Sequence, residues 1–333
     1  MKFFKRFIQI LGALLLTIVL VFVVAKVNGY IQLKEFYDNS DKEFMIPGLF
    51  DNFIPQGMDY DDAKDSFIIT GYQKGTSKAT AYLVDKDRNA KKFYFKNSKD
   101  EECMDHCGGV TIYKNYLLVS GGDGSSKGAQ FVYTFNLSDV YSVSEGKEIK
   151  SLAETSVAVG TAFVNAVDDT LYVGEFNHDG SALYDVKKTT ERSWMQEDTK
   201  AFMLSYTIKD DGTIEASPNK AYAIPDDVQG MAITKEGNVL FSKSYGINPG
   251  FISVYEKMPD TVSKVINIDG VDTPLYYFNE SIFKKDIKVS PMIEAIVYSN
   301  NKVYTLNESA SLKYFYGLFF RGSSVYSYNY NHE

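Results

Sequence analysis

The stretch from Asp227 to Ser242 shows the hydrophobic and polar pattern that organises this chain. A polar residue and a glycine lead into alternating apolar positions, which are followed by the turn Gly237-Asn238 and a second β-rich run. Two such runs across a glycine-containing turn predict an antiparallel strand pair. The pattern recurs in altered form at four other places, and this recurrence predicts a repeat architecture.

Aligned on the residue before the first apolar run, the five repeats start at Gln56, Gly108, Thr161, Gln229 and Glu294. The first repeat contains four strand-like runs in about forty residues, the size of one β-propeller blade. We therefore expect an all-β propeller with five blades, or six if an insertion hides a degenerate blade. The unequal spacing indicates inserted loops, chiefly 177–200 and 257–290. No series of amphipathic helices alternates with the strands, so an α/β fold is disfavoured.

The last repeat offers only three clear strands before the end of the sequence. We expect the segment 28–52, which connects the N-terminus to a propeller at 53–333, to donate the missing outer strand. Closure of the ring in this way removes exposed sheet edges.

The N-terminus predicts a membrane anchor at residues 1–27. Lys2, Lys5 and Arg6 precede an uncharged run of nineteen residues, Phe7 to Ala25, which is about long enough to cross a bilayer as a helix. The flanking cations predict a cytoplasmic N-terminus and a body at the cell membrane outside the cytoplasm. A cleaved signal peptide, which would give a secreted body, is the alternative, although its apolar region is usually shorter.

Composition limits the partners. The chain is 44% hydrophobic and 15% aromatic, enough for a large core in one domain. Its net charge of -8, without a basic cluster outside the N-terminus, argues against nucleic acid. Small molecules and proteins therefore remain as the expected classes of ligand.

The starting residues of the repeats form the main candidate site. In a propeller the first strand of each blade lines the central channel, so Gln56, Gly108, Thr161, Gln229 and Glu294 should converge near the axis. The alternative is that these residues only satisfy backbone groups where strands crowd together. Glu294 is less easily explained in that way, because a buried acidic side chain costs free energy without a partner.

A second candidate lies in the loop Cys103-Met-Asp-His-Cys107, just before an inner strand. Cys103 and Cys107 are the only cysteines, and export favours a disulfide between them. Unpaired thiols and, less readily, a metal site are the alternatives, because the spacing does not guarantee bond geometry. His106 is the best candidate acid or base, since imidazole titrates near neutrality.

The ends of the second strands should reach the same rim of the channel. These ends supply further candidate binding residues, namely Glu175, His178, Lys243, Tyr245 and Glu308. No nucleophile elbow, phosphate loop, zinc-protease or EF-hand motif is present, so the sequence names no specific reaction.

The phrases Gln229-Gly-Met-Ala-Ile-Thr and Gln56-Gly-Met-Asp-Tyr-Asp resemble the blade signature of gluconolactonase, strictosidine-synthase and paraoxonase-like propellers, over short hairpins only. This resemblance implies a calcium ion on the axis and hydrolysis of lactones or esters. The matching positions would place Glu294, Gln56 and Gln229 around the metal. Gln56 and Gln229 replace carboxylates typical of that group, and calcium sites depend on negatively charged oxygen ligands.

The chain is also similar to a group of uncharacterised membrane-anchored propellers of Gram-positive bacteria. Their signatures match His106 to Gly109, Val228 to Gly230 and Pro291 to Glu294. This similarity implies no activity.

Two functions of different classes follow. The first is an anchored extracytoplasmic propeller that binds a small-molecule or protein ligand at its channel mouth. The second is a lactone or ester hydrolase that uses His106 and Glu294, with or without a metal ion. A purely structural envelope protein is a third possibility.

Overall fold

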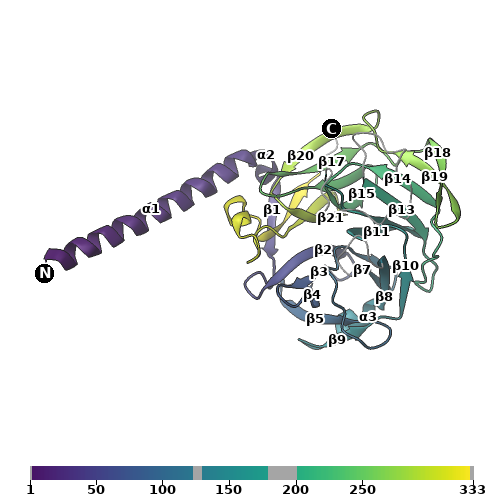
Figure 1. Cartoon of the computed structure of the whole chain (residues 1–333), viewed down its shortest axis with the longest axis horizontal. Helices are drawn as coiled ribbons and strands as arrows, with labels where there is room; N and C mark the ends of the chain where they lie inside the picture. Colours follow the sequence, from purple (N-terminus) through teal and green to yellow (C-terminus); the bar gives the residue numbers. More distant parts are fainter. Residues whose placement is uncertain (1, 123–129, 179–200, 331–333) are drawn as a thin grey trace.

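The computed structural model describes residues 2–122, 130–178 and 201–330. Their strands form five sheets arranged around a central axis, and a long helix projects away from them (Figure 1). The expected five-bladed propeller is confirmed.

Among the described residues, the first three blades contain five, four and six strands. The strands of each blade are named in their order in the sheet, from the axis outwards. The first blade contains β2 (Phe53–Asp61), β3 (Ser66–Gln73), β4 (Ala79–Val84), β5 (Ala90–Lys96) and β9 (Glu148–Lys150). The second contains β6 (Val110–Tyr113), β7 (Tyr116–Gly122), β8 (Gln130–Asn136) and β10 (Ala153–Ser156), with the short helix α3 (Leu137–Ser142) after β8. The third contains β11 (Phe163–Val167), β12 (Thr170–Gly174), β13 (Ala201–Thr207), β14 (Lys220–Ile224), β19 (Val271–Tyr277) and β18 (Lys264–Ile268).

The fourth blade contains β15 (Val228–Ile233), β16 (Val239–Lys243), β17 (Gly250–Tyr255) and β20 (Phe283–Val289). The fifth contains β21 (Ile293–Ser299), β22 (Lys302–Asn307), β23 (Ser324–Asn329) and β1 (Ser40–Met45). The innermost strands β2, β6, β11, β15 and β21 contact one another in sequence order, and β21 contacts β2. The ring is therefore closed.

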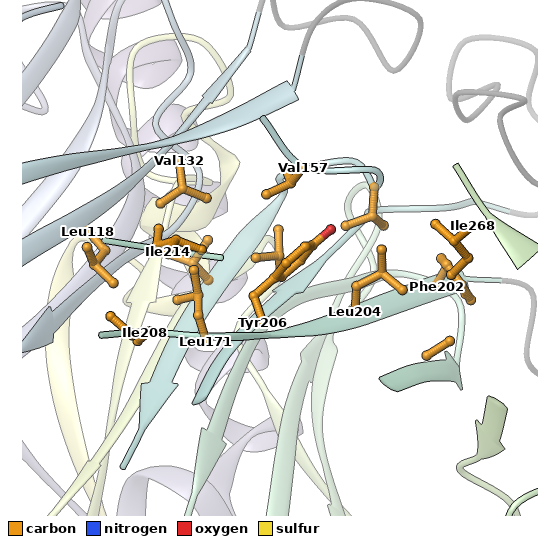
Figure 2. Close-up of a cluster of buried hydrophobic side chains, with 14 of the residues drawn as sticks. Leu118, Val132, Val157, Leu171, Phe202, Leu204, Tyr206, Ile208, Ile214 and Ile268 are labelled. Atoms are coloured by element: carbon orange, nitrogen blue, oxygen red, sulfur yellow. The ribbon is translucent and has the colours of Figure 1, made fainter. Parts of the chain in front are cut away.

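The core lies between adjacent blades. Figure 2 shows one such layer, in which Leu118 and Val132 of the second blade pack against Leu171 and Leu204 of the third. The hydroxyl of the fully buried Tyr206 accepts a hydrogen bond of 3.1 Å from the Ala158 amide, so its polar end is satisfied. Strands buried on both faces explain why many of them read as continuous apolar runs rather than as an alternation.

The expected loop 257–290 is instead largely β-structure, because it contains β18, β19 and β20. The hairpin β18–β19 extends the third blade, with β19 parallel to β14, and β20 is the outer strand of the fourth. In β20 the run Phe283-Lys-Lys-Asp shows no alternation of buried and exposed residues, because all four lie exposed on this outer strand. Most of the other expected insertion, 179–200, lies outside the described residues.

The predicted closing strand is β1, which pairs antiparallel with β23 and completes the fifth blade. Phe44 of β1 is buried, and its ring centroid lies 5.0 Å from that of Phe67 in the first blade. The N-terminal strand therefore fills the joint between the last blade and the first.

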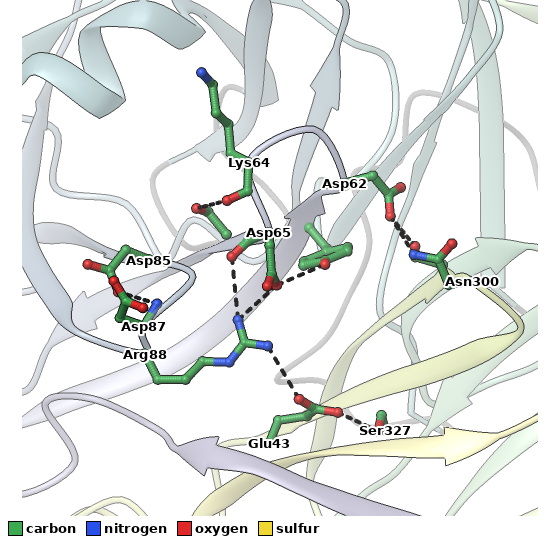
Figure 3. A network of polar contacts seen from close by, with 12 residues as sticks. Glu43, Asp62, Lys64, Asp65, Asp85, Asp87, Arg88, Asn300 and Ser327 are labelled. Carbon is green, nitrogen blue, oxygen red and sulfur yellow. Dashed lines mark hydrogen bonds and ion pairs between the residues drawn. The ribbon is translucent and has the colours of Figure 1, made fainter.

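A polar network stabilises the same joint (Figure 3). Arg88 of the first blade lies 3.0 Å from Asp65 and 3.5 Å from Glu43 of β1. Glu43 accepts a 2.6 Å hydrogen bond from Ser327 of β23, and Asp62 accepts one of 3.0 Å from Asn300. These contacts join the first blade to the last.

The anchor helix is longer than expected. Helix α1 (Lys2–Gln32) continues beyond residue 27, and α2 (Lys34–Asp38) follows it directly, so the first part of the expected polar connection is helical. The buried side chains Leu33, Phe36 and Tyr37 attach it to the propeller, and this packing explains the helical conformation. By length and composition α1 could cross a membrane as an anchor or serve as a signal sequence.

Candidate functional site

Three of the five axial candidates lie at β-bulges. The strand registers slip between Pro55 and Gly57, between Val228 and Gly230, and between Ile293 and Ala295. The residues at these slips are Gln56, Gln229 and Glu294. A bulge inserts one unpaired residue and re-aims its side chain, which here brings all three to the axial cavity.

The glycine after each glutamine has a steric role. A Cβ atom at Gly57 would lie 2.5 Å from the Thr70 hydroxyl oxygen, and one at Gly230 would lie 2.8 Å from the Glu294 carbonyl oxygen. Neighbouring inner strands crowd together at this level, and only a small residue fits there. The Gln-Gly pair therefore combines a bulge with a close approach of two strands.

The second and third blades present smaller groups to the axis. A Cβ at Gly108 would meet the Ala162 carbonyl oxygen at 2.5 Å, so no side chain fits there. Thr161 donates a 2.8 Å hydrogen bond to the Gly121 carbonyl and lies 2.9 Å from the Gln130 side-chain oxygen. The hypothesis that such residues satisfy backbone groups describes Thr161 well.

The axial residues surround a cavity of about 430 Å³. Its lining includes the five starting residues of the repeats, together with Tyr72, His106, Gln130, Glu175, Phe176, Tyr245, Met292, Glu308, Lys313, Tyr314 and Tyr316. The predicted convergence of the repeat starts is thus found in the structure, while their roles stay predictions.

Two carboxyl groups meet in this cavity. Glu294 and Glu308 are buried and hydrogen-bond each other, which requires a proton on one of them. Burial and the neighbouring Glu308 raise the pKa of Glu294 well above its ordinary value. Burial raises the pKa of Glu308 to about 7, against the opposing effects of the Lys313 charge and a hydrogen bond from Gln56. The pair therefore keeps at least one proton at neutral pH, and Glu308 ionises near pH 7.

Amide groups complete the surroundings of the pair. The Gln56 side-chain nitrogen donates to Glu308 over 2.8 Å, and that of Gln229 donates to Glu294 over 3.4 Å. The hydroxyl of Tyr314 also hydrogen-bonds Glu308. Each carboxyl group is thus held from two sides by groups of different blades.

Lys313 brings the balancing charge. Its ammonium group donates a hydrogen bond of 2.7 Å to the Tyr72 hydroxyl and lies 4.7 Å from the centre of the Tyr314 ring. Burial lowers the pKa of Lys313, but hydrogen bonds to Tyr314 and Tyr72 outweigh burial, so the pKa is raised and the side chain is cationic.

His106 lies at the cavity wall, as expected. Its ring packs against that of Tyr72 at an interplanar angle of 31°, with the centroids 4.4 Å apart. Burial and, to a smaller extent, the charge of Lys313 lower the pKa of His106, so the imidazole is neutral at pH 7. A neutral imidazole can accept a proton, while the acid or base role of His106 stays a prediction.

Of the other expected strand-end residues, Glu175 and Tyr245 line the cavity, whereas His178 does not line it directly but packs on Tyr245. Tyr245 lines the cavity, and its ring stacks on His178 at a centroid distance of 3.5 Å. His178 Nδ1 lies 2.7 Å from Asp227 Oδ1, which fixes the imidazole. Glu175 is buried and lines the cavity as well.

Lys243 does not line the cavity, in contrast to the prediction. It pairs across the sheet with Val228, whose side chain is buried in the core between blades. Opposite residues of a strand pair share one face of the sheet, so Lys243 belongs to a blade face rather than to the axis.

The predicted disulfide is absent, and Cys103 and Cys107 are free thiols, which was one of the alternatives. The amide of Cys103 donates a hydrogen bond to the Phe95 carbonyl, and the carbonyl of Cys103 accepts one from the Ala79 amide. The carbonyl of Cys107 accepts a hydrogen bond from the Thr70 hydroxyl. The loop is thus held by its own hydrogen bonds, and both side chains pack in the core between the first and second blades. Burial raises the pKa of Cys103 to about 12.

The donor atoms on the axis differ from those of the calcium site that the resemblance implies. Gln56, Gln229 and Glu294 do meet on the axis. However, the side-chain N–H groups of the two glutamines donate hydrogen bonds to the carboxyl pair, and the two carboxyls hydrogen-bond each other. Calcium requires six to eight oxygen ligands. Among residues 2–122, 130–178 and 201–330, no three His, Cys, Asp or Glu side chains gather to hold one metal. This donor set fits a shared proton and does not fit calcium.

Several cavity residues were missed by the sequence reasoning. Tyr72 lies at the end of the second strand of the first blade, so the rule that selected Glu175 and Glu308 could have found it. Lys313, Tyr314 and Tyr316 lie in the irregular connection between β22 and β23, which has no strand pattern. Nothing in their spacing indicates a position at the axis.

Comparisons with known proteins assign no family. No family model matches the chain, and no curated protein matches it. Among solved structures, the Malassezia sympodialis allergen Mala s 1 is similar at 11% identity with a TM-score of 0.42, over 87% of this chain and 94% of that one.

Two further structures are similar to the same extent. The PQQ-bound aldose sugar dehydrogenase of Streptomyces coelicolor has 11% identity and a TM-score of 0.38, over 76% of this chain and 74% of that one. A glucose dehydrogenase described for Thermus has 12% identity and a TM-score of 0.40, over 80% and 79%. Scores this low carry no conclusion about function.

Proposed function

We propose that this protein is a membrane-anchored propeller that binds a small, neutral, hydroxyl-bearing molecule in its axial cavity, on the extracytoplasmic side of the membrane. The observation that carries the proposal is the meeting of the Glu294–Glu308 pair, two glutamine amides and Lys313 in one cavity of about 430 Å³. Cavities of this size hold small ligands. A concave site favours a small molecule over a protein surface.

The charges around Lys313 support a neutral ligand in that part of the cavity. When Glu308 is ionised the carboxyl pair carries one negative charge and Lys313 carries one positive charge, so these three groups sum to zero. Glu175 is a further buried carboxyl group of the lining. A charged ligand would have to be desolvated without a free counter-charge among these three groups, which is costly.

The hydrogen-bonding groups support a ligand with several hydroxyls. The carboxyls accept or donate, and the amides of Gln56 and Gln229 and the hydroxyl of Tyr314 do both. The rings of Tyr245 and Tyr316 also line the cavity and offer apolar faces for the carbon skeleton of such a molecule. Groups of this kind select ligands by hydroxyl placement, because an unpaired buried group is penalised.

Binding can be tested with the full chain in nanodiscs. A panel of neutral mono- and disaccharides and polyols is compared with uronic acids and amino sugars by calorimetry and thermal unfolding. We expect at least one neutral compound to bind and to raise the unfolding temperature. Gln56→Leu should weaken that binding at least tenfold. Glu280→Gln, at an exposed position outside the cavity, is the control.

The ligand proposal fails if only charged compounds bind, or if Gln56→Leu binds as well as the control variant does. Binding of no compound in the panel, with the protein folded, also argues against this ligand class.

Hydrolysis of a lactone or ester is a second candidate, supported by the shared proton and the pKa of about 7 for Glu308. The ionised carboxyl would take a proton from water while the water oxygen bonds to the carbonyl carbon, and the protonated partner would donate its proton to the carbonyl oxygen. On collapse the protonated carbonyl oxygen returns its proton to the carboxyl that gave it, the C=O bond re-forms, and the bond to the leaving oxygen breaks. The leaving oxygen takes the proton that the other carboxyl had received from water, so both carboxyls return to their starting states. Neutral His106 is the alternative base.

Turnover of an ester and lactone panel distinguishes the two candidates. A hydrolase should lose at least a hundredfold in kcat/KM in Glu308→Gln and Glu294→Gln. Turnover at the level of buffer for the unsubstituted protein, together with retained ligand binding, excludes the hydrolase.

A further inference from the structure

The anchor helix packs against the short 3₁₀ helix η2 (Tyr316–Phe320), which belongs to the connection between β22 and β23. The rings of Phe22 and Phe319 meet edge to face with centroids 5.3 Å apart. Closer to the C-terminal end of α1, a Cβ atom at Gly29 would collide with the Phe319 carbonyl oxygen, so the two backbones approach closely there. Helix α1 and η2 therefore have a defined relative position.

The position of these contacts along α1 fixes the height of η2 relative to the apolar run of that helix. The apolar run ends at Ala25. With a rise of about 1.5 Å per residue, Phe22 lies about 4.5 Å inside that end and Gly29 about 6 Å beyond it. The run itself is about 28 Å long, close to the roughly 30 Å of a bilayer hydrocarbon core. If α1 crosses a bilayer, the hydrocarbon core of that bilayer therefore ends at the height of η2, on the side where the C-terminal end of α1 emerges.

The residues around η2 have the composition expected at such a level. Phe315 is 63% exposed and Leu312 is 44% exposed, although both are large and apolar. Arg321 lies over the Tyr30 ring at 4.4 Å, and Lys26 lies 5.2 Å from the centre of the Phe22 ring. Apolar side chains bordered by cations and tyrosines are typical of membrane interfaces.

We propose that the segment from Leu312 to Phe320 rests in the interface of the bilayer that α1 crosses, in the leaflet at the C-terminal end of that helix. The occupant of this apolar surface is lipid, because Phe319 is in contact with Phe22, a residue of the membrane-spanning run. The same segment contributes Lys313, Tyr314 and Tyr316 to the axial cavity. One rim of the cavity therefore lies beside the membrane surface.

Tryptophan fluorescence in nanodiscs tests this position with the full chain. The native Trp194 is first replaced by Phe, and then Phe315→Trp or Leu312→Trp is introduced. Val265→Trp on β18 is the matched control, since Val265 is 61% exposed and β18 lies on the side of the propeller away from α1 (Figure 1). The nanodiscs contain phosphatidylcholine brominated near the headgroup end of its chains.

We expect brominated lipid to quench the Phe315→Trp and Leu312→Trp emission at least twofold relative to unbrominated lipid, with no quenching of Val265→Trp. Circular dichroism confirms that each variant is folded. Equal quenching of all three tryptophans, or none at positions 312 and 315, overturns the proposal. A blue-shifted emission without quenching at these positions also overturns it, because a protein rather than lipid then covers the segment. The outcome is independent of any ligand in the cavity.

Discussion

Glu294 and Glu308 hydrogen-bond each other across the open end of the hairpin formed by β21 and β22. Ile293 pairs with Asn307, the residues immediately before them, and the bulge at Glu294 turns the two side chains toward the axis. Two buried carboxyls in contact require one proton between them, and this proton links the stability of the fold to pH.

The first prediction concerns that pH dependence. The folded-state pKa of Glu308 is raised from 4.5 to about 7, so the folded state binds more protons than the unfolded chain between these values. Its contribution is complete below about pH 4.5 and is lost as the pH rises through about 7. Between pH 5 and 8, the free energy of unfolding should fall by roughly 1–3 kcal/mol less in Glu308→Gln than in the unsubstituted protein.

Chemical denaturation at several pH values measures this effect. Asp59, whose pKa burial raises to about 6, contributes to the same pH range in every variant, so only the difference between variants is informative. Glu280→Gln should follow the unsubstituted protein. An unchanged slope in Glu308→Gln would show that the pair shares no proton.

The second prediction concerns Lys313. Its charge lowers the pKa values of both His106 and Glu308. Lys313→Met keeps the length of the side chain and removes the charge, so both pKa values should rise. Titration of the histidine ring protons by NMR measures the shift of His106. Lys86→Met, at an exposed position, should leave it unchanged, and the same titration curve in Lys313→Met would contradict the placement of the ammonium group.

The third prediction concerns ring closure. Phe44 of β1 is buried against Phe67, so Phe44→Ala should lower the free energy of unfolding by about 3 kcal/mol. Phe50→Ala is a matched control, because Phe50 is 66% exposed and lies a few residues later in the same chain segment. It should change stability by less than about 0.5 kcal/mol. Equal effects in urea unfolding would mean that β1 does not close the ring.

The fourth prediction concerns the cysteines. Protein unfolded in denaturant without reductant should react with two equivalents of a thiol reagent, since Cys103 and Cys107 are free. In the folded protein the reaction should be slow at pH 7, because burial raises both pKa values and suppresses the reactive thiolate. Cys103→Ser should give one equivalent. No reactive thiol after unfolding would establish the disulfide instead.

Part of the site could be predicted because it follows the strand pattern. Gln56, Gln229 and Glu294 start repeats, and Glu175, Tyr245 and Glu308 follow second strands, so blade geometry alone carries them to one rim. Lys243 was selected by the same rule and was misplaced, because it is still the last residue of β16 and pairs with Val228. Glu175, Tyr245 and Glu308 lie beyond the ends of β12, β16 and β22, and hydrophobicity alone does not show at which residue a strand ends.

The alternation of apolar residues and the Gly-containing turns determined the five blades, the closing N-terminal strand and the apolar helix, because these features depend on local periodicity and on the need to bury apolar surface. Only the tertiary structure decided that Glu308 meets Glu294, that Lys313 and Tyr314 enter the cavity, that the cysteines stay apart, and that η2 meets α1. These contacts join segments that have no shared period, and their energies depend on burial and on neighbouring charges, which exist only once the ring has closed.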